Sequence, residues 1–496
     1  MHGGILLATI NAKWIHPSLA LRLLRANLGP LEERCGIMEF ALRQPLQEKI
    51  DPILSVRPRI LGLSVSIWNL RATVELLKEL RKTWDGGEVP RPFVVLGGPE
   101  VSYLPDDAEI FQHADCRVLG EGEAVFRELC EAIMSSDGDT GVCDHALSET
   151  RKKMLTANHG FQQVDLTSIK TGYRFYTDED LRKKLVYVEA SRGCPHACEF
   201  CLSARESGRN KKVREFPLEP FFEEMGELID RGGIRTFKFL DRSFNSNTAR
   251  AKRIMDFFLG RLEEACSQNT SCNSIFTVHF EMLPSRFPPE LMETIARFPP
   301  GSLRLEIGIQ TLNPEVSARI GRPSDPLREL EALRLLRRET NAIIHADLIA
   351  GLPGEDMASF GRGFDLLWEV LSPPIGSSSG RPSSVEIQLG ILKLLPGAPI
   401  ARHSAAFGMV YDFLPPYEVT ETAAIPARDM GRIKNFARFW ELVVNRGLAD
   451  VGPSPVFDRF MALSDSLFAH FGRNWGIPKA ELLEVVFGSK NVKENA

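Results

Sequence analysis

The chain has 496 residues, too many for a single hydrophobic core, so we expect two to four domains. Its hydrophobic share of 43% and charged share of 25% are ordinary for a globular protein, and a net charge of −5 gives no indication of nucleic-acid binding. No stretch approaches the ~20 consecutive apolar residues that span a bilayer. The N-terminal residues lack the pattern of a signal peptide, so a cytoplasmic location is expected.

The first 136 residues alternate short apolar runs with amphipathic stretches. Helices are expected at 17–28 and 69–84, where apolar residues recur at three- and four-residue steps. The apolar runs are nearly continuous, as is typical of strands buried on both faces. They predict five strands, at 3–10, 36–42, 59–67, 92–98 and 116–122. This order predicts an α/β fold, a doubly wound parallel sheet of the Rossmann or flavodoxin type, over residues 1–136.

A second alternating run follows a predicted linker at 137–184. Its strands are expected at 185–191, 236–244, 276–282, 302–310, 342–351 and 385–392. Helical stretches separate them, such as 217–231, 325–338 and 357–371. Six β/α units predict a partial (β/α)6 barrel of the TIM type over residues 185–400, with a flexible loop at 373–384. The strand pattern stops near residue 400, so residues 401–496 are expected to form a small helical domain.

Three of the nine cysteines fall within eight residues of the segment "SRGCPHACEFCLSAR", as Cys194, Cys198 and Cys201. Thiolates are the usual ligands of iron–sulfur clusters, and three of them on a four-iron cluster leave one iron open. A structural zinc site is the alternative, but it requires four ligands, and only His196 lies nearby. The spacing therefore predicts a [4Fe–4S] cluster held by these three cysteines.

This motif follows the first strand of the predicted barrel, and Phe200 precedes its last cysteine. In these features the chain resembles the radical S-adenosylmethionine (SAM) superfamily, which implies that the open iron binds the methionine moiety of SAM. The segments "HADLIAGLPGED" and "LKLLPGAP" resemble the strand-five and strand-six segments of that superfamily. The resemblance implies SAM contacts at Phe200, Asp241, Glu281, Glu306, Gln310, Gly351 and Leu394.

A doubly wound domain before such a barrel is similar to the arrangement in cobalamin-binding radical SAM enzymes. The segments "LSVSIWN", "VLGGPEVSY" and "LGEGEAVFREL" end neighbouring predicted strands, at the edge where such sheets bind ligands. The resemblance implies cobalamin contacts at His16, Ser64, Ser66, Gly97, Gly98, Gly120, Glu121 and Gly122.

Two of these positions carry a more specific expectation. His16 lies in "NAKWIHPSL", where cobalamin domains with a protein axial ligand carry D-x-H-x-x-G, so an axial role and a structural role are both open. Gly98 lies in a predicted surface loop that can absorb an added side chain. We therefore expect Gly98→Leu to give folded protein with an intact cluster and little bound cobalamin.

The resemblance implies an enzyme that methylates an unactivated carbon of an unknown substrate, through a 5′-deoxyadenosyl radical and methylcobalamin. A cobalamin-dependent rearrangement or cyclisation is one alternative. A methylthiotransferase-like enzyme is another, although the four upstream cysteines are too scattered for a second cluster. A small-molecule or peptide substrate and an electron donor such as flavodoxin or ferredoxin are the expected partners.

Overall fold

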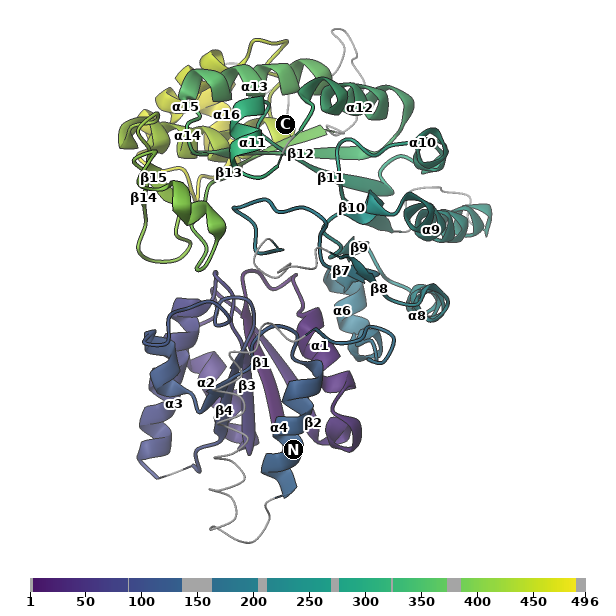
Figure 1. Cartoon of the computed structure of the whole chain (residues 1–496), viewed down its shortest axis with the longest axis vertical. Helices are drawn as coiled ribbons and strands as arrows, with labels where there is room; N and C mark the ends of the chain where they lie inside the picture. The colour runs from purple at the N-terminus through teal and green to yellow at the C-terminus, as the bar shows by residue number, and fades with distance from the viewer. Residues whose placement is uncertain are drawn as a thin grey trace. The chain divides into compact units, whose positions relative to one another are not determined.

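The computed structural model describes residues 3–87, 89–135, 163–203, 212–268, 276–322, 324–372 and 385–487. The chain forms two compact units, one of Met1–Arg192 with Arg214–Leu240 and one of Gly193–Val213 with Asp241–Ala496 (Figure 1). The predicted loop at 373–384 lies outside the described residues, as does the predicted linker up to residue 162. None of the described helices is long and apolar enough to cross a membrane.

The first unit begins with a five-stranded sheet in the order β2-β1-β3-β4-β5, in which every neighbouring pair is parallel. Its strands are β1 (Ile5–Asn11), β2 (Cys35–Ala41), β3 (Ile60–Ser64), β4 (Phe93–Gly97) and β5 (Cys116–Arg117). The interior strand β1 is buried along its whole length. This is the doubly wound sheet that the sequence predicts.

Helices cover both faces of this sheet (Figure 1). Leu6, Ala8 and Ile10 of β1 belong to a core cluster with α2 (Gln47–Val56) and α3 (Leu70–Asp85). Ile5 and Leu7 point the other way, into a second cluster with α1 (Leu19–Ala26) and α4 (Glu123–Ser135). Because alternate strand residues face opposite sides, both sets must be apolar, which explains the continuous apolar runs.

The rest of the first unit contains the beginning of the second alternating run. Its elements are η3 (Tyr173–Phe175), α6 (Asp178–Lys183), β6 (Val186–Val188), β7 (Ser191–Arg192), β8 (Arg214–Glu215), α8 (Leu218–Arg231) and β9 (Thr236–Phe239). Strands β6 and β9 pair in parallel, whereas β7 and β8 form a short antiparallel pair. Two of these elements, η3 and α6, lie in the segment predicted as linker. They were missed because three- and six-residue elements are too short to show a period.

The second unit contains four strands that pair in parallel in chain order. They are β10 (Thr277–Met282), β11 (Leu303–Gln310), β12 (Ile343–Ala350) and β13 (Val385–Ile391). The helices that precede or separate them are α9 (Thr248–Gln268), α10 (Pro289–Arg297), α11 (Pro314–Arg319), α12 (Pro326–Glu339) and α13 (Met357–Leu371). With β6 and β9, the described residues of this run contain six strands that alternate with helices, and the predicted α/β fold class is confirmed.

Strand β11 shows how the second unit separates an apolar from a polar face. Leu303, Leu305, Ile307 and Ile309 are buried, and the residues between them are half-buried. The half-buried set is Arg304, Glu306, Gly308 and Gln310. Because side chains alternate along a strand, these polar residues share one face of the sheet.

The C-terminal region is mainly helical, as the sequence predicts. It contains η5 (Pro399–His403), β14 (Val410–Tyr411), β15 (Val419–Glu421), α14 (Ala427–Trp440), η6 (Glu441–Asn445), α15 (Phe457–Phe471) and α16 (Lys479–Phe487). Phe436 and Trp440 of α14 stack on each other and contact Phe460 of α15, which joins the two helices. The strands β14 and β15 were not predicted, since two or three residues cannot show alternation.

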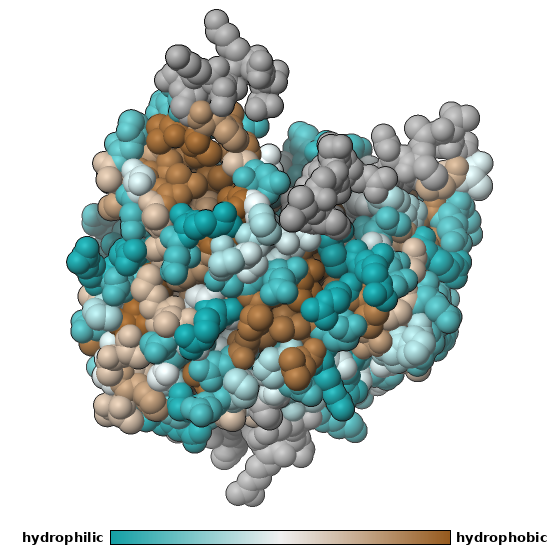
Figure 2. Space-filling view, turned by 90° about the horizontal axis from the view of Figure 1, so that it is seen from above, coloured by the Kyte–Doolittle hydropathy of each residue, from teal (hydrophilic) through white to brown (hydrophobic). Residues whose placement is uncertain are grey.

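The surface of the second unit mixes hydrophilic and apolar side chains. Leu327, Leu366 and Phe468 are exposed on α12, α13 and α15. Brown apolar patches lie among hydrophilic residues on the face drawn in Figure 2. Such scattered exposure is ordinary for a globular protein and identifies no site.

Candidate cofactor sites

The cysteine motif forms a turn that gathers the three thiols. The Cys201 amide donates to the Cys198 carbonyl over 3.0 Å, and none of the three forms a disulfide. Burial raises the pKa of the Cys198 thiol, the Arg322 guanidinium opposes this, and the thiols of Cys201 and Cys194 raise the pKa further. The Cys198 thiol therefore lies close enough to the sulfur atoms of Cys194 and Cys201 for their charges to act on it.

The donor set fits a cubane better than a single ion. Among the described residues, no three His, Cys, Asp or Glu side chains form a group that could hold one metal ion. Cys194, Cys198 and Cys201 are free thiols within eight residues, and thiolates are the usual ligands of iron–sulfur clusters, so these residues suit the predicted [4Fe–4S] cluster.

Two polar side chains lie beside the thiols, and sequence reasoning did not identify either of them as a site residue. An Nη atom of Arg322 lies 3.8 Å from Cys198 Sγ, and the Ser243 hydroxyl lies 3.8 Å from Cys194 Sγ. The other Nη atom of Arg322 donates to the Gly308 carbonyl on β11. Arg322 is 124 residues from Cys198 in the chain, so only the fold brings them together. In the sequence, Arg322 is marked by its position after Gly321, in a turn that follows α11.

Gln310 is a predicted SAM residue that the fold brings from a distant strand to the neighbourhood of Arg322. It ends β11 with a left-handed backbone, φ 69°, which turns its side chain back towards Gly308. Gly308 is the residue whose carbonyl accepts from Arg322. Gln310, Arg322 and Cys198 thus form one neighbourhood at the carboxyl end of a parallel strand, where such folds bind ligands.

The three predicted carboxylates have different surroundings. Glu306 lies 2.9 Å from His279 Nε2, and Glu281 lies 3.8 Å from Arg242. Asp241 follows β9 directly and is only 2% exposed. Their contacts with SAM remain predictions.

Gly351 and Leu394 both contact the C-terminal region, and their contacts with SAM remain predictions. Gly351 has a φ of 84°, and an added Cβ would lie 3.0 Å from Met430 Cε and would overlap Val419. The Leu394 amide donates to the Tyr417 carbonyl over 2.9 Å. Packing against the C-terminal region therefore explains this glycine. Phe200, the seventh predicted SAM residue, is half-buried in the cysteine turn.

A charged network covers the polar face of the strands below this site. Arg304 of β11 pairs with Glu386 of β13, and His345 of β12 lies 3.1 Å from Asp347 and 3.4 Å from Glu386. Burial alone would lower the pKa of His345, but the two carboxylates raise it to about 9. Burial likewise opposes ionisation of Glu386, yet His345 and Arg304 lower its pKa to about 2. Both groups are therefore charged at neutral pH.

This network predicts a specific pH dependence of stability. The pKa of His345 is raised from 6.5 to about 9, so its contribution is complete below pH 6.5 and is lost as the pH rises through about 9. The thermal stability of His345→Gln should thus fall below that of wild type at about pH 6, and the gap should close by about pH 10. Thermal unfolding of both proteins across this range measures the gap. A gap that widens with pH would contradict the assignment.

The carboxyl edge of the first sheet is organised by Asn69, another residue that sequence reasoning missed. Its side chain is fully buried and donates to the carbonyls of Ile10 at 2.9 Å and Ser64 at 3.1 Å. Its carboxamide oxygen accepts from the amide of Ser66 at 2.7 Å. The predicted cobalamin residues Ser64 and Ser66 are therefore fixed on a rigid strand end.

The two glycines after β4 differ sharply. An added Cβ on Gly97 would meet no atom within 4 Å, so the space beside it is open. Gly98 has a φ of 104°, and an added Cβ would lie 2.9 Å from the Val65 amide and would overlap the Val65 carbonyl. The expectation that Gly98 tolerates a side chain is therefore wrong, because the backbone of Val65 lies against it. Gly97 is the position that a ligand could approach.

The residues of the "GEGE" segment contact other groups of the protein. Glu121 pairs with Arg214 and accepts from the Val164 amide over 2.7 Å. Arg192, two residues before Cys194, lies 2.7 Å from Glu123. Gly120 has a φ of 71°, and a Cβ on Gly122 would lie 3.2 Å from Leu24 of α1. These contacts give the segment a structural role, and its cobalamin contacts remain predictions.

His16 is held by a neighbouring phenol. Its Nδ1 lies 2.8 Å from the Tyr187 hydroxyl. Burial lowers the pKa of His16, and Lys13 and Lys238 lower it further, so the imidazole is neutral at pH 7. A neutral imidazole with one nitrogen engaged is compatible with metal ligation through the other, as well as with a purely structural role. Axial ligation remains a prediction.

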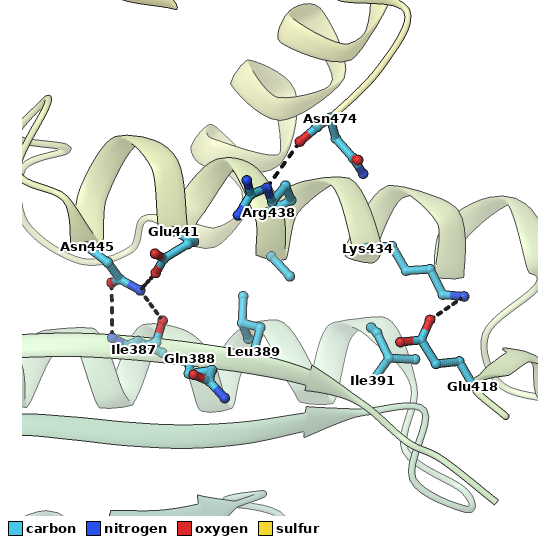
Figure 3. Close-up of a pocket in the computed structure, with 11 residues that line it drawn as sticks. Ile387, Gln388, Leu389, Ile391, Glu418, Lys434, Arg438, Glu441, Asn445 and Asn474 are labelled. Atoms are coloured by element: carbon cyan, nitrogen blue, oxygen red, sulfur yellow. Dashed lines mark hydrogen bonds and ion pairs between the residues drawn. The ribbon is translucent and has the colours of Figure 1, made fainter. Parts of the chain in front are cut away.

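A separate cavity of about 440 Å³ lies between β13 and α14 (Figure 3). Glu418 and Lys434 form an ion pair of 3.1 Å in it. The Asn445 side-chain oxygen accepts a hydrogen bond from the Ile387 amide on β13, and its side-chain nitrogen donates to the Ile387 carbonyl. These are the two backbone groups that a neighbouring strand would pair with. No cysteine of the motif lines this cavity, which is therefore distinct from the cluster loop.

The fold and the cysteine turn together define a class of protein. A family model of the radical SAM superfamily matches residues 188–367, and a model of the B12-binding domain matches residues 5–130. The chain therefore carries a B12-binding domain and a radical SAM domain over these residues. Its cofactors are a [4Fe–4S] cluster, SAM and cobalamin, as the sequence predicts.

Curated relatives agree with this class. An uncharacterised methyltransferase of Pyrococcus horikoshii is 27% identical over 53% of this chain and 55% of the relative. The cobalamin-dependent radical SAM methyltransferase TokK of Streptomyces tokunonensis is 25% identical over 72% of this chain and 50% of the relative. A threonylcarbamoyladenosine tRNA methylthiotransferase of Thermotoga maritima is 26% identical over 48% and 52%. The chain spans about half the length of these curated relatives.

Solved structures show the same fold. The radical SAM methyltransferase TsrM of Kitasatospora setae, determined with tryptophan and a SAM analogue, matches with a TM-score of 0.57 and 17% identity. That match covers 86% of this chain and 80% of TsrM. The cobalamin-dependent radical SAM enzyme OxsB matches with a TM-score of 0.64 and 14% identity, over 94% of this chain and 71% of OxsB. At such identities the match establishes the fold alone.

Proposed function

We propose that the protein is a methyltransferase that uses SAM and cobalamin to methylate an unactivated carbon. The observation that carries the proposal is that one chain contains two candidate cofactor sites. The cysteine turn has Arg322 and Gln310 beside it, and the carboxyl edge of a doubly wound sheet has open space at Gly97. The names of two curated relatives, both methyltransferases, support the same reaction.

The residues of this chain have distinct roles in the proposed reaction. Cys194, Cys198 and Cys201 would hold the cluster, and the Arg322 cation beside Cys198 suits a carboxylate at its open side. Gln310 offers a side-chain amide in the same neighbourhood. When bound, the cofactors supply the radical and the methyl group, whereas the protein binds and orients them. The rigid strand end at Ser64 would support the cobalamin.

A methylthiotransferase is the second candidate, because such enzymes are among the relatives. It would need three more thiolates in the first domain for a second cluster. Cys35, Cys116 and Cys130 share one core cluster there, and burial raises the pKa of Cys35 to about 12. Cys35 and Cys116 begin β2 and β5, so they lie at the amino-terminal edge of the sheet, opposite the predicted cobalamin edge. The burial of these three thiols in the core favours the methyltransferase.

Transfer of a labelled methyl group tests the proposal without knowledge of the substrate. The anaerobically reconstituted enzyme would be incubated with SAM labelled in its methyl group, reduced cobalamin and a chemical reductant. We expect labelled methylcobalamin and S-adenosylhomocysteine, because a methyltransferase of this kind must load its cobalamin from SAM. Mass spectrometry of the small molecules measures both. Formation of 5′-deoxyadenosine with no S-adenosylhomocysteine would instead favour a rearrangement or cyclisation.

A further inference from the structure

Glu199 lies between two of the cysteines that would bind the cluster, yet its side chain points into the protein. Its carboxylate is 10% exposed and pairs with Arg402, and His403 Nε2 lies 3.0 Å from its other oxygen. Arg402 and His403 belong to η5, the turn that follows β13. One carboxylate of the cluster loop is thus shared by two basic side chains from a distant segment.

The backbone of Glu199 is fixed as firmly as its side chain. Its amide donates to the Ile320 carbonyl over 2.9 Å, and its carbonyl accepts from the Ile400 amide over 3.1 Å. The loop also passes close to Gly321, where an added Cβ would lie 2.8 Å from the Ala197 carbonyl. Glu199 is therefore held between the turn before Arg322 and the η5 turn.

These contacts matter because regular structure does not fix the loop. The described residues from Gly193 to Ser203 contain no strand or complete helix that would set the positions of the thiols. Arg402 is 65% exposed, and alone such a pair would contribute little. His403 is only 13% exposed, however, and a carboxylate buried without its partners is costly. The shared carboxylate should therefore hold the loop more strongly than a surface ion pair.

We infer that Glu199 is a positioning residue that sets where Cys198 and Cys201 stand relative to Arg322 and η5. Through Glu199, the cluster loop is tied to the start of the C-terminal region as well as to the turn that presents Arg322. The inference rests on the proposed function, since it concerns the geometry of the cluster. Loss of the carboxylate should leave the three thiols in the chain but loosen their mutual arrangement.

Cluster stability in air is the test. Glu199→Gln keeps the shape of the side chain and removes its charge, and His403→Ala removes one partner. We expect both variants to fold and to take up iron, but to lose visible cluster absorption in air about fivefold faster than wild type, because the loop opens more often. The reduced cluster should also show a broadened EPR spectrum. The double variant Glu199→Gln/His403→Ala should bleach no faster than Glu199→Gln, because the two residues share one interaction.

A matched control is available in the same unit. Asp465→Asn breaks a 2.9 Å ion pair with Arg432 in the C-terminal helices, and should bleach like wild type. The inference would be overturned if the Glu199→Gln cluster bleached at the wild-type rate with a wild-type EPR spectrum. It would also be overturned if the two substitutions had additive effects on the bleaching rate of the double variant. If either of these results is obtained and wild type still binds iron and cleaves SAM, the proposed function stands and only the role of Glu199 fails. If wild type takes up no iron at all, the proposed function fails as well.

Discussion

Cys198→Ala is expected to remove the iron–sulfur cluster and with it all reductive cleavage of SAM. Cys198 is the most buried thiol of the turn, at 7% exposure, and both of its neighbours in the motif depend on it to complete the donor set. Wild type should contain about four iron and four sulfide per chain after anaerobic reconstitution. The variant should contain little of either and lack the brown colour. Iron and sulfide assays, with chromatography of 5′-deoxyadenosine, measure the loss.

Cys266→Ala is the matched control for this prediction. Cys266 is a half-buried thiol on α9, outside the motif, so its removal should leave iron content and SAM cleavage unchanged. A variant with all three motif cysteines replaced that nevertheless retains full iron would refute the cluster assignment.

Gly97→Leu is expected to give folded protein with an intact cluster and at least about tenfold weaker cobalamin binding, a factor that corresponds to ~1.4 kcal/mol. An added Cβ at Gly97 meets no protein atom within 4 Å, so the new side chain would occupy the space proposed for the cofactor. Equilibrium binding of cobalamin, followed by absorption, measures the effect. Wild-type affinity in the variant would place the cobalamin elsewhere.

Gly98→Leu provides the contrast. Its left-handed φ of 104° and the Val65 backbone beside it leave no room for a side chain. We therefore expect this variant to lose thermal stability, with weaker cobalamin binding only as a consequence. If Gly98→Leu unfolds at the wild-type temperature while Gly97→Leu is destabilised, then Gly97 is the crowded position and Gly98 the open one, which contradicts our assignment.

The sequence by itself determined the main architecture. Strands buried on both faces must be apolar at every position, so β1, β3 and β4 were visible as continuous runs close to their observed bounds. The three cysteines were equally visible, because ligands that belong to one turn are close in sequence. The expected cofactors and enzyme class followed from the family resemblance that this turn, its place after the first barrel strand and the preceding doubly wound domain carry.

Only the tertiary structure decided which residues surround these features. Arg322 and His403 reach the cluster loop from segments more than a hundred residues away, and no local pattern records such a contact. Gly97 and Gly98 look equivalent as neighbours in the sequence, yet the path of Val65 makes one open and the other crowded. Glu121 in turn is engaged by Arg214. Periodicity and spacing report what one segment needs locally, whereas the partner of a side chain depends on how distant segments pack against it.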